Sequence, residues 1–340
     1  MSTCHFLILS AAALLLYPQS ARAGQQMQGQ QMQGQQMQGQ QMQGTSAQGT
    51  SPGASLTSGG YAVAEVPLNH FYSGWLGDFD QDSPAVIKKG ELFLVLANGT
   101  TISGKALVGA YVPADRNGNR VWTIINSVSH DPTFPEGGTS LYGIDVINSD
   151  GTTSPLCGPD RNGVSAAIPV AALFNTHGDR VESTTQFTFS CTSGVVAKCY
   201  RWGYRPWLQG AGSPDEFTNL HWACVRMARA DYCGNGQTWT HTGTLINMWD
   251  LAPAPGPFQS HGPSDPTFVF EAGWSTRGAV CLSKQRWATL PPDIAANCPD
   301  RLVPPGASTS AGTVCNSSAE VPQFDATTEL FNESKVNVSP

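Results

Sequence analysis

The stretch Ser213–Gly236, SPDEFTNLHWACVRMARADYCGNG, has the features of one amphipathic helix with marked ends. Ser213 is suited to cap the helix, Pro214 to occupy its first position, and Glu216 to bond back to the cap in a capping box. Apolar positions then recur at steps of three and four residues, which forms one stripe along a helix. The stripe comprises Phe217, Leu220, His221, Cys224, Met227, Ala228 and Asp231. This spacing predicts a helix at about residues 214–232.

The predicted end of the helix raises the question of what Asp231 does. Gly234 and Gly236 follow it and are suited to the left-handed residue that stops a helix. Asp231 itself falls on the buried stripe, where an unpaired carboxylate would be costly. We therefore expect Asp231 to accept hydrogen bonds from backbone amides or an arginine, and so to tie the helix end to the rest of the domain.

A catalytic role is the alternative for the same helix. His221, Arg226 and Asp231 would supply a general base, a cation and a carboxylate to a hydrolase. His221 and Asp231 are about three helical turns apart, however, so a direct bond requires the chain to fold back. We favour structural roles, with His221 as a core histidine, and keep the hydrolase as the second hypothesis.

Three blocks of the sequence resemble the ADYC domain, a family of exported bacterial proteins common in myxobacteria. They are CYRWGYRPW at Cys199–Trp207, CVRMARADYCG at Cys224–Gly234 and FEAGWSTRGAVC at Phe270–Cys281. With PLCG at Pro155–Gly158 these blocks lie within 155–281, and we expect the ADYC-like region to extend over about residues 85–302. It implies export, and it assigns no activity, cofactor or catalytic residue to this chain.

Residues 1–23 have the pattern of a secretory signal. Leu7–Tyr17 is an apolar core too short to span a bilayer, and Ala21-Arg22-Ala23 is a small-x-small cleavage site. We expect cleavage after Ala23 and a secreted, periplasmic or cell-surface protein. No later run has the length and composition of a transmembrane segment.

The chain divides by composition after the signal. Residues 24–60 begin with four copies of Gly-Gln-Gln-Met-Gln and continue as a Gly/Ser/Thr-rich linker, so we expect a disordered spacer. Whether the repeat holds the domain away from a surface or has no role stays open. Residues 61–305 are globular in composition, enough for one large core or two small ones. Residues 306–340 are rich in Ser, Thr, Asn and Pro and are expected to form a tail, pinned by Cys315.

Strand patterns dominate the globular part. Several of them are separated by turn dipeptides at hairpin spacing, such as Asn117-Gly118 and Asp150-Gly151. Short helices are expected at residues 194–202 and 291–297. The predicted strands are 92–97, 106–112, 121–128, 141–147, 166–174, 187–191, 244–248 and 268–270. The fold class is therefore α+β and β-rich, with an antiparallel sheet body, one main helix and one or two short helices.

Cysteine usage predicts disulfides. Of nine cysteines, eight remain once Cys4 leaves with the signal, and an even number in an exported chain favours up to four disulfides. These eight are Cys157, Cys191, Cys199, Cys224, Cys233, Cys281, Cys298 and Cys315. Their connectivity is not readable from the sequence. The spacing disfavours zinc, and Asp78, Asp80 and Asp82 lack the rest of a calcium loop, so we expect no metal and no cofactor.

One aromatic cluster is a candidate binding surface. Trp202, Tyr204 and Trp207 alternate with arginines and would suit sugar faces or a planar ligand, although packing in the core is the favoured interpretation. A net charge of −7 without a basic run argues against nucleic acid. The sequence therefore favours a non-enzymatic binding or structural surface protein, with a protein or glycan at the cell surface as its partner.

Overall fold

A computed structural model of the chain describes part of its 340 residues. The predictions for the signal at 1–23, for Ser213 and Pro214, for the aspartates at 78, 80 and 82 and for a helix at 291–297 lie outside that part. The described residues are 37–39, 63–67, 72–73, 85–96, 98–116, 119–133, 139–160, 162–175, 177–208, 215–240, 244–252, 261, 265–286, 298, 302 and 313–335.

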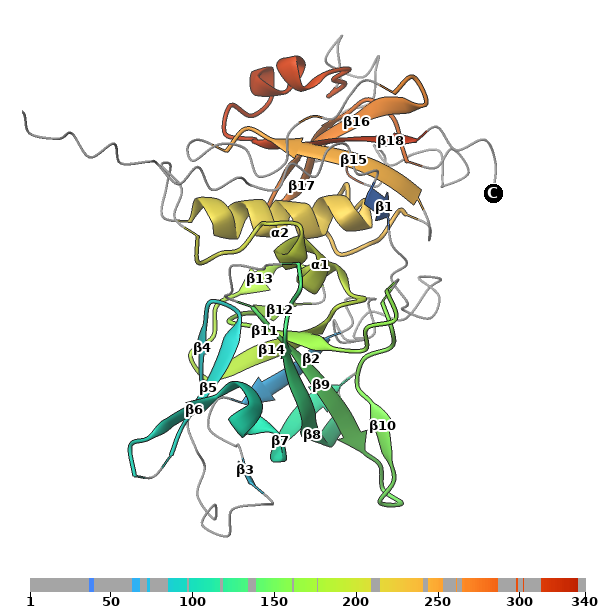
Figure 1. Cartoon of the computed structure of the whole chain (residues 1–340). Coiled ribbons are helices and arrows are strands. Elements are labelled where there is room, and N and C mark those ends of the chain that lie inside the picture. Colours follow the sequence, from blue (N-terminus) through green and yellow to red (C-terminus); the bar gives the residue numbers. More distant parts are fainter. Residues whose placement is uncertain are drawn as a thin grey trace, which may run out of the picture. The chain divides into compact units, whose positions relative to one another are not determined.

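Antiparallel strands of the first half form a closed barrel (Figure 1). The order is β7 (Ala110–Arg116), β8 (Asn119–His130), β9 (Ser140–Ile147), β11 (Ala167–Val170), β14 (Gln186–Cys191) and β2 (Val63–Pro67), which pairs again with β7. Closure gives each strand two neighbours and so removes the sheet edges. The alternating inward residues fill the interior, and Val112, Ile125, Tyr142, Phe187 and Phe189 are all buried there.

Shorter strands extend this barrel or lie beside it. β10 (Thr153–Pro155) pairs with β9, and β3 (Tyr72–Ser73) pairs with β7. A separate small sheet contains β4 (Ala85–Lys88), β5 (Glu91–Val95) and β6 (Thr101–Ser103), followed by the 3-10 helix η1 (Gly104–Leu107). β12 (Leu173–Phe174) and β13 (Arg180–Val181) form a two-stranded ribbon.

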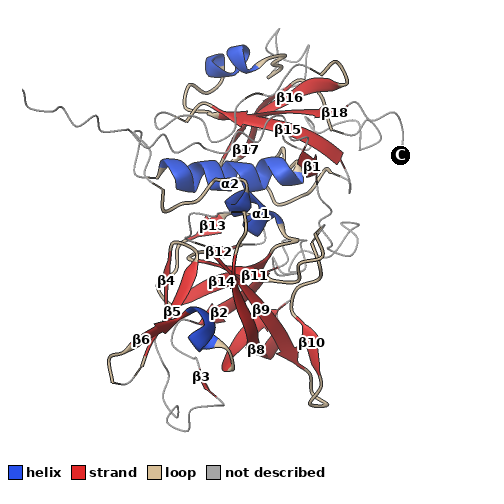
Figure 2. Cartoon of the chain, in the orientation of Figure 1, coloured by secondary structure: helices blue, strands red, loops and turns tan. Residues whose placement is uncertain are grey.

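The second half is a sheet packed on a helix (Figure 2). Helix α2 (Glu216–Arg229) contacts this sheet through β16, β17 and β18, and contacts helix α1 (Val195–Arg201), which in turn contacts β14. Neither helix of the described chain is long and apolar enough to span a membrane. The strand order is β1 (Met37–Gly39), β15 (Thr244–Asp250), β18 (Leu330–Lys335), β16 (Phe268–Ser275) and β17 (Gly278–Leu282), and the 3-10 helix η2 is Ser318–Gln323.

Four disulfides cross-link these elements, as the even number of cysteines predicted. Cys199–Cys224 joins α1 to α2, and Cys281–Cys315 joins β17 to the segment before η2. The other pairs are Cys157–Cys191, at one end of the barrel, and Cys233–Cys298. Multiple disulfides are typical of extracellular proteins, because the cytosol keeps thiols reduced.

The β-rich α+β prediction is confirmed, with local corrections. The strand predicted at 106–112 begins only at Ala110, because η1 occupies the residues before it, and the strand predicted at 166–174 breaks into β11 and β12. The spacer predicted at 24–60 contains β1. The tail predicted at 306–340 contains η2 and the central strand β18, whose buried residues include two polar ones, Asn332 and Ser334.

Candidate functional site

The main helix ends at an alanine in the left-handed conformation. Ala230 has φ 52° and ψ 41°. The N–H of Ala230 donates to the carbonyl oxygen of Met227 at 2.9 Å, and the N–H of Asp231 donates to the carbonyl oxygen of Arg226 at 2.9 Å. This pair of bonds is the Schellman arrangement, which usually places glycine where Ala230 stands. The prediction that Gly234 or Gly236 stops the helix is therefore wrong, since both belong to the following turn. At the other end, Asp215 rather than Ser213 occupies the N-cap position.

Asp231 ties that turn to the helix, as expected for a structural role. One carboxylate oxygen accepts the N–H of Asn235 at 3.1 Å, and the other accepts the N–H of Gly236 at 3.0 Å. The second oxygen also lies 2.5 Å from Nη1 of Arg226. Arg226 and Asp231 both have fully buried side chains, so the two charges neutralise each other away from water.

Arg226 also fixes a hairpin turn to the helix. Its guanidinium donates to Oδ1 of Asp179 at 2.5 Å and to the carbonyl oxygens of His177 and, at 3.1 Å, Thr276. On the same side of α2, the indole N–H of Trp222 donates to the carbonyl of Gly178 at 3.1 Å. Each of the three guanidinium nitrogens of Arg226 therefore donates to a group within the chain.

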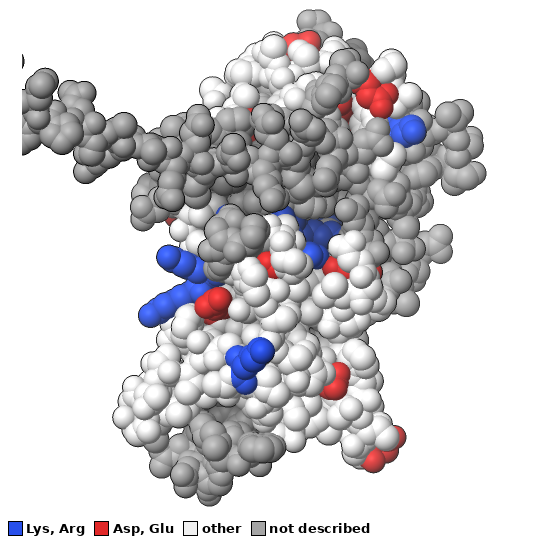
Figure 3. All heavy atoms as spheres, viewed as in Figure 1, with Lys and Arg blue, Asp and Glu red and all other residues white. Residues whose placement is uncertain are grey.

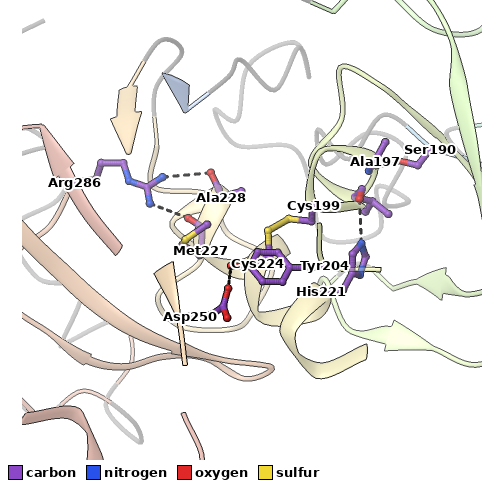
Figure 4. Close-up of a disulfide and its surroundings, with 11 residues drawn as sticks. Ser190, Ala197, Cys199, Tyr204, His221, Cys224, Met227, Ala228, Asp250 and Arg286 are labelled. Carbon is purple, nitrogen blue, oxygen red and sulfur yellow. Dashed lines mark hydrogen bonds between the residues drawn. A yellow bond between two sulfur atoms is a disulfide. The ribbon is translucent and has the colours of Figure 1, made fainter. Parts of the chain in front are cut away.

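His221 occupies a different environment from Arg226 and Asp231. Its Nε2 donates to the carbonyl of Val196 in α1 at 3.1 Å, and its ring meets that of Tyr200 edge-on at 4.6 Å. Burial lowers the pKa of His221 to about 3, so the imidazole is neutral at ordinary pH. Figure 4 shows this residue beside the Cys199–Cys224 disulfide. The three candidate catalytic residues thus form two separate sets of contacts, both internal.

The next residue of the signature, Tyr232, is part of a buried polar network. Its hydroxyl donates to Oε1 of Glu271 at 3.0 Å and accepts the backbone N–H of Arg286 at 2.8 Å. Its ring stacks on Trp274 at 5.3 Å between centroids. The carbonyl of Tyr232 accepts the N–H of Ala279, so this turn also covers the outer edge of β17.

Arg286 connects this network to the end of the main helix. Its Nε and Nη2 bond the two oxygens of Glu271 at 3.0 and 2.9 Å, a bidentate pair. The same guanidinium donates to the carbonyls of Met227 at 2.8 Å and Ala228 at 3.3 Å (Figure 4), which satisfies the last turn of α2. Burial alone would raise the pKa of Glu271, but the charge of Arg286 holds it below its usual value.

The predicted aromatic cluster is divided between the core and a partly buried surface. Tyr204 is fully buried and donates to Oδ2 of Asp250 at 3.0 Å (Figure 4). Trp207 is partly buried, packs 5.2 Å from Tyr200 between centroids, and lies so close to Gly90 that a Cβ there would come within 2.8 Å of its ring. Trp202 is also partly buried against the core. Among the tryptophans that the structure describes, the most exposed is another one, Trp122 in β8, at 48%.

Several of these residues carry no signal that sequence reasoning could use. Glu271 and Arg286 are charged residues at fully buried positions, where sequence rules expect apolar ones. Trp122 stands in a strand whose barrel neighbours are known only from the structure. Within the described chain, no group of three or more His, Cys, Asp or Glu residues is arranged to hold a metal ion.

A family model described as the ADYC domain matches residues 104–288, more than half of the chain. Among the curated proteins and the solved structures compared with the chain, none matches it. The matched region begins at η1 and ends just beyond Arg286. It therefore contains both helices and the network at the end of α2, whereas β2 and β18 lie outside it.

Proposed function

Because the chain belongs to the ADYC domain family and carries four disulfides, we propose that it is an extracellular, non-enzymatic surface protein that binds a partner. The observation that supports the non-enzymatic part most directly is burial. His221, Arg226 and Asp231 each have 0% relative exposure, and each bonds to groups of the same chain. A catalytic acid or base has to reach the substrate, and a structural residue does not.

The surface that best suits a partner is the outer face of the barrel at β8 and β9. Trp122 lies directly opposite Ile147, and the next outward pair is Ile124 with Asp145. Paired residues of antiparallel strands share a face, so an indole, two aliphatic side chains and a carboxylate lie together on a rigid surface. Ile124, Asp145 and Ile147 are partly exposed.

A glycan is the partner that this surface fits best. Exposed aromatic rings stack on sugar faces, and a neighbouring carboxylate accepts hydrogen bonds from hydroxyl groups. Figure 3 shows that charged side chains are few on the visible face and do not gather in one large patch. This distribution suits an uncharged partner better than a polyanion.

The test compares glycan-array binding by the exported protein and its Trp122→Ala variant. Leu251→Ala is the matched control, because Leu251 is 60% exposed and follows β15 rather than the barrel. We expect Trp122→Ala to reduce binding at least tenfold and Leu251→Ala to leave it unchanged. Equal binding by all three proteins would reject this surface. A hydrolytic activity that disappears in a folded His221→Gln variant would reject the non-enzymatic assignment.

A further inference from the structure

The outer edge of β15 is occupied by part of the glutamine- and methionine-rich repeat. β15 pairs with β18 on one side, and on the other side it pairs antiparallel with β1. The register places Met37 opposite Ile246, Gln38 opposite Leu245 and Gly39 opposite Thr244. An uncovered strand edge would present unpaired N–H and C=O groups, which backbone pairing with β1 satisfies.

The three residues of β1 occur four times in the sequence. Met37-Gln38-Gly39 is one copy of a Met-Gln-Gly unit that the five-residue repeat also places at 27–29, 32–34 and 42–44. Each copy is preceded by Gln-Gln, so its immediate N-terminal sequence is the same as that of β1. Any copy can therefore present the same residue opposite each position of β15, whereas a shift by fewer than five residues cannot.

We propose that the outer edge of β15 is a docking site for this Met-Gln-Gly unit, and that the four copies in the same chain are interchangeable occupants. Backbone pairing does not distinguish between copies of identical sequence. Each copy therefore contributes to the fraction of molecules in which the outer edge of β15 is paired. The linker between the repeat and β2 provides the reach, and tethering keeps the effective concentration high. The repeat is then an internal ligand of the sheet, a role beyond that of a spacer and separate from partner binding.

Hydrogen exchange of single amides in β15 tests this proposal on the full chain. Alternate N–H groups of a strand point to opposite neighbours, so one set among Thr244, Leu245 and Ile246 faces β1, and one set among residues 246–250 faces β18. When reclosing is faster than exchange, protection of the set that faces β1 is proportional to the number of competent copies. The set that faces β18 serves as the control in the same spectrum.

The variants disable one, three or all four copies. The double substitution Met37→Pro/Gln38→Pro deletes the backbone N–H groups of both residues and prevents this copy from pairing with β15. We expect the protection factor of the β15 amides that face β1 to fall only to about three-quarters of its original value. The same change in three copies should leave about one-quarter, and the change in all four should abolish protection. Complete loss with the single pair of substitutions would overturn interchangeability, and unchanged protection with all four would overturn docking. Protection that rises with protein concentration would overturn the assignment to the same chain and identify a second copy as the donor.

Discussion

Arg226 and Asp231, five residues apart, form an ion pair with 2.5 Å between Nη1 and Oδ2, and both side chains are inaccessible to solvent. The pair joins the last turn of the main helix to the turn that follows it. Because an unpaired charge in a fully buried position is strongly destabilising, each of the two residues requires the other as its counter-charge.

Asp231→Asn should lower the free energy of unfolding by about 3–5 kcal/mol, because it leaves the Arg226 charge without its fully buried counter-charge. Urea denaturation measures this quantity. Asp179→Asn is the matched control, since Asp179 also bonds Arg226 but is 40% exposed, and its loss should cost about 1 kcal/mol or less. The double variant Arg226→Met/Asp231→Asn should cost less than the sum of its single changes. Additive costs would show that the two residues do not act as a pair.

His221 should make the fold sensitive to acid. Burial lowers its folded-state pKa from 6.5 to about 3, so between these values the unfolded chain binds a proton that the folded chain does not. The contribution of His221 is complete above pH 6.5 and is lost as the pH falls towards 3. His221→Gln keeps a donor for Val196 and cannot titrate. From pH 7 to pH 4 the variant should therefore lose about 3 kcal/mol less stability than the parent. Parallel stability curves would contradict this assignment.

Ala230 should tolerate glycine better than its neighbour in the helix. A left-handed alanine costs about 1 kcal/mol, which glycine relieves, whereas glycine within a helix costs up to about 1 kcal/mol. We expect Ala230→Gly to leave the free energy of unfolding unchanged or slightly raised, and Ala228→Gly to lower it by about 1 kcal/mol. Thermal or urea unfolding of the two variants gives the comparison. Equal losses at both positions would argue against the left-handed stop.

Peptide mapping without reduction should identify four links, 157–191, 199–224, 233–298 and 281–315. Cys199→Ala/Cys224→Ala should lower the free energy of unfolding by about 2–4 kcal/mol, because it frees the loop between the two helices. Partners other than these in the folded, exported protein would contradict the structure.

Removal of residues 328–340 should prevent stable folding. It deletes β18, whose Leu330, Phe331, Asn332 and Ser334 are fully buried, and it leaves β15 and β16 without their shared neighbour. Removal of residues 336–340 alone should have little effect, because β18 ends at Lys335. Near-ultraviolet circular dichroism and protease resistance distinguish the outcomes. A folded product of the longer truncation would show that the sheet does not require β18.

The sequence predicted the features that repeat or that obey local rules. The helix followed from apolar spacing, the strands from alternation, and the disulfides from an even cysteine count. Ala230 could not be identified, because positive φ favours glycine and two glycines stood nearby. Cysteine partners depend on tertiary structure, so their pairing was not readable.

The sequence also did not reveal which polar residues are buried. β18 reads as a polar segment, but Asn332 and Ser334 are fully buried, and Asn332 accepts the indole N–H of Trp274 at 2.7 Å. Glu271 and Arg286 lie in the core because each supplies the other's counter-charge. Such pairs are visible only when both members are in place, and single-residue propensities describe one member at a time.

The position of β18 between β15 and β16 has a consequence for biogenesis. Synthesis from the N-terminus delivers the matched region first, and the sheet that packs on α2 stays unfinished until β18 has been made. Chains that stop before β18 should therefore fail to complete this sheet and remain substrates for quality-control proteases.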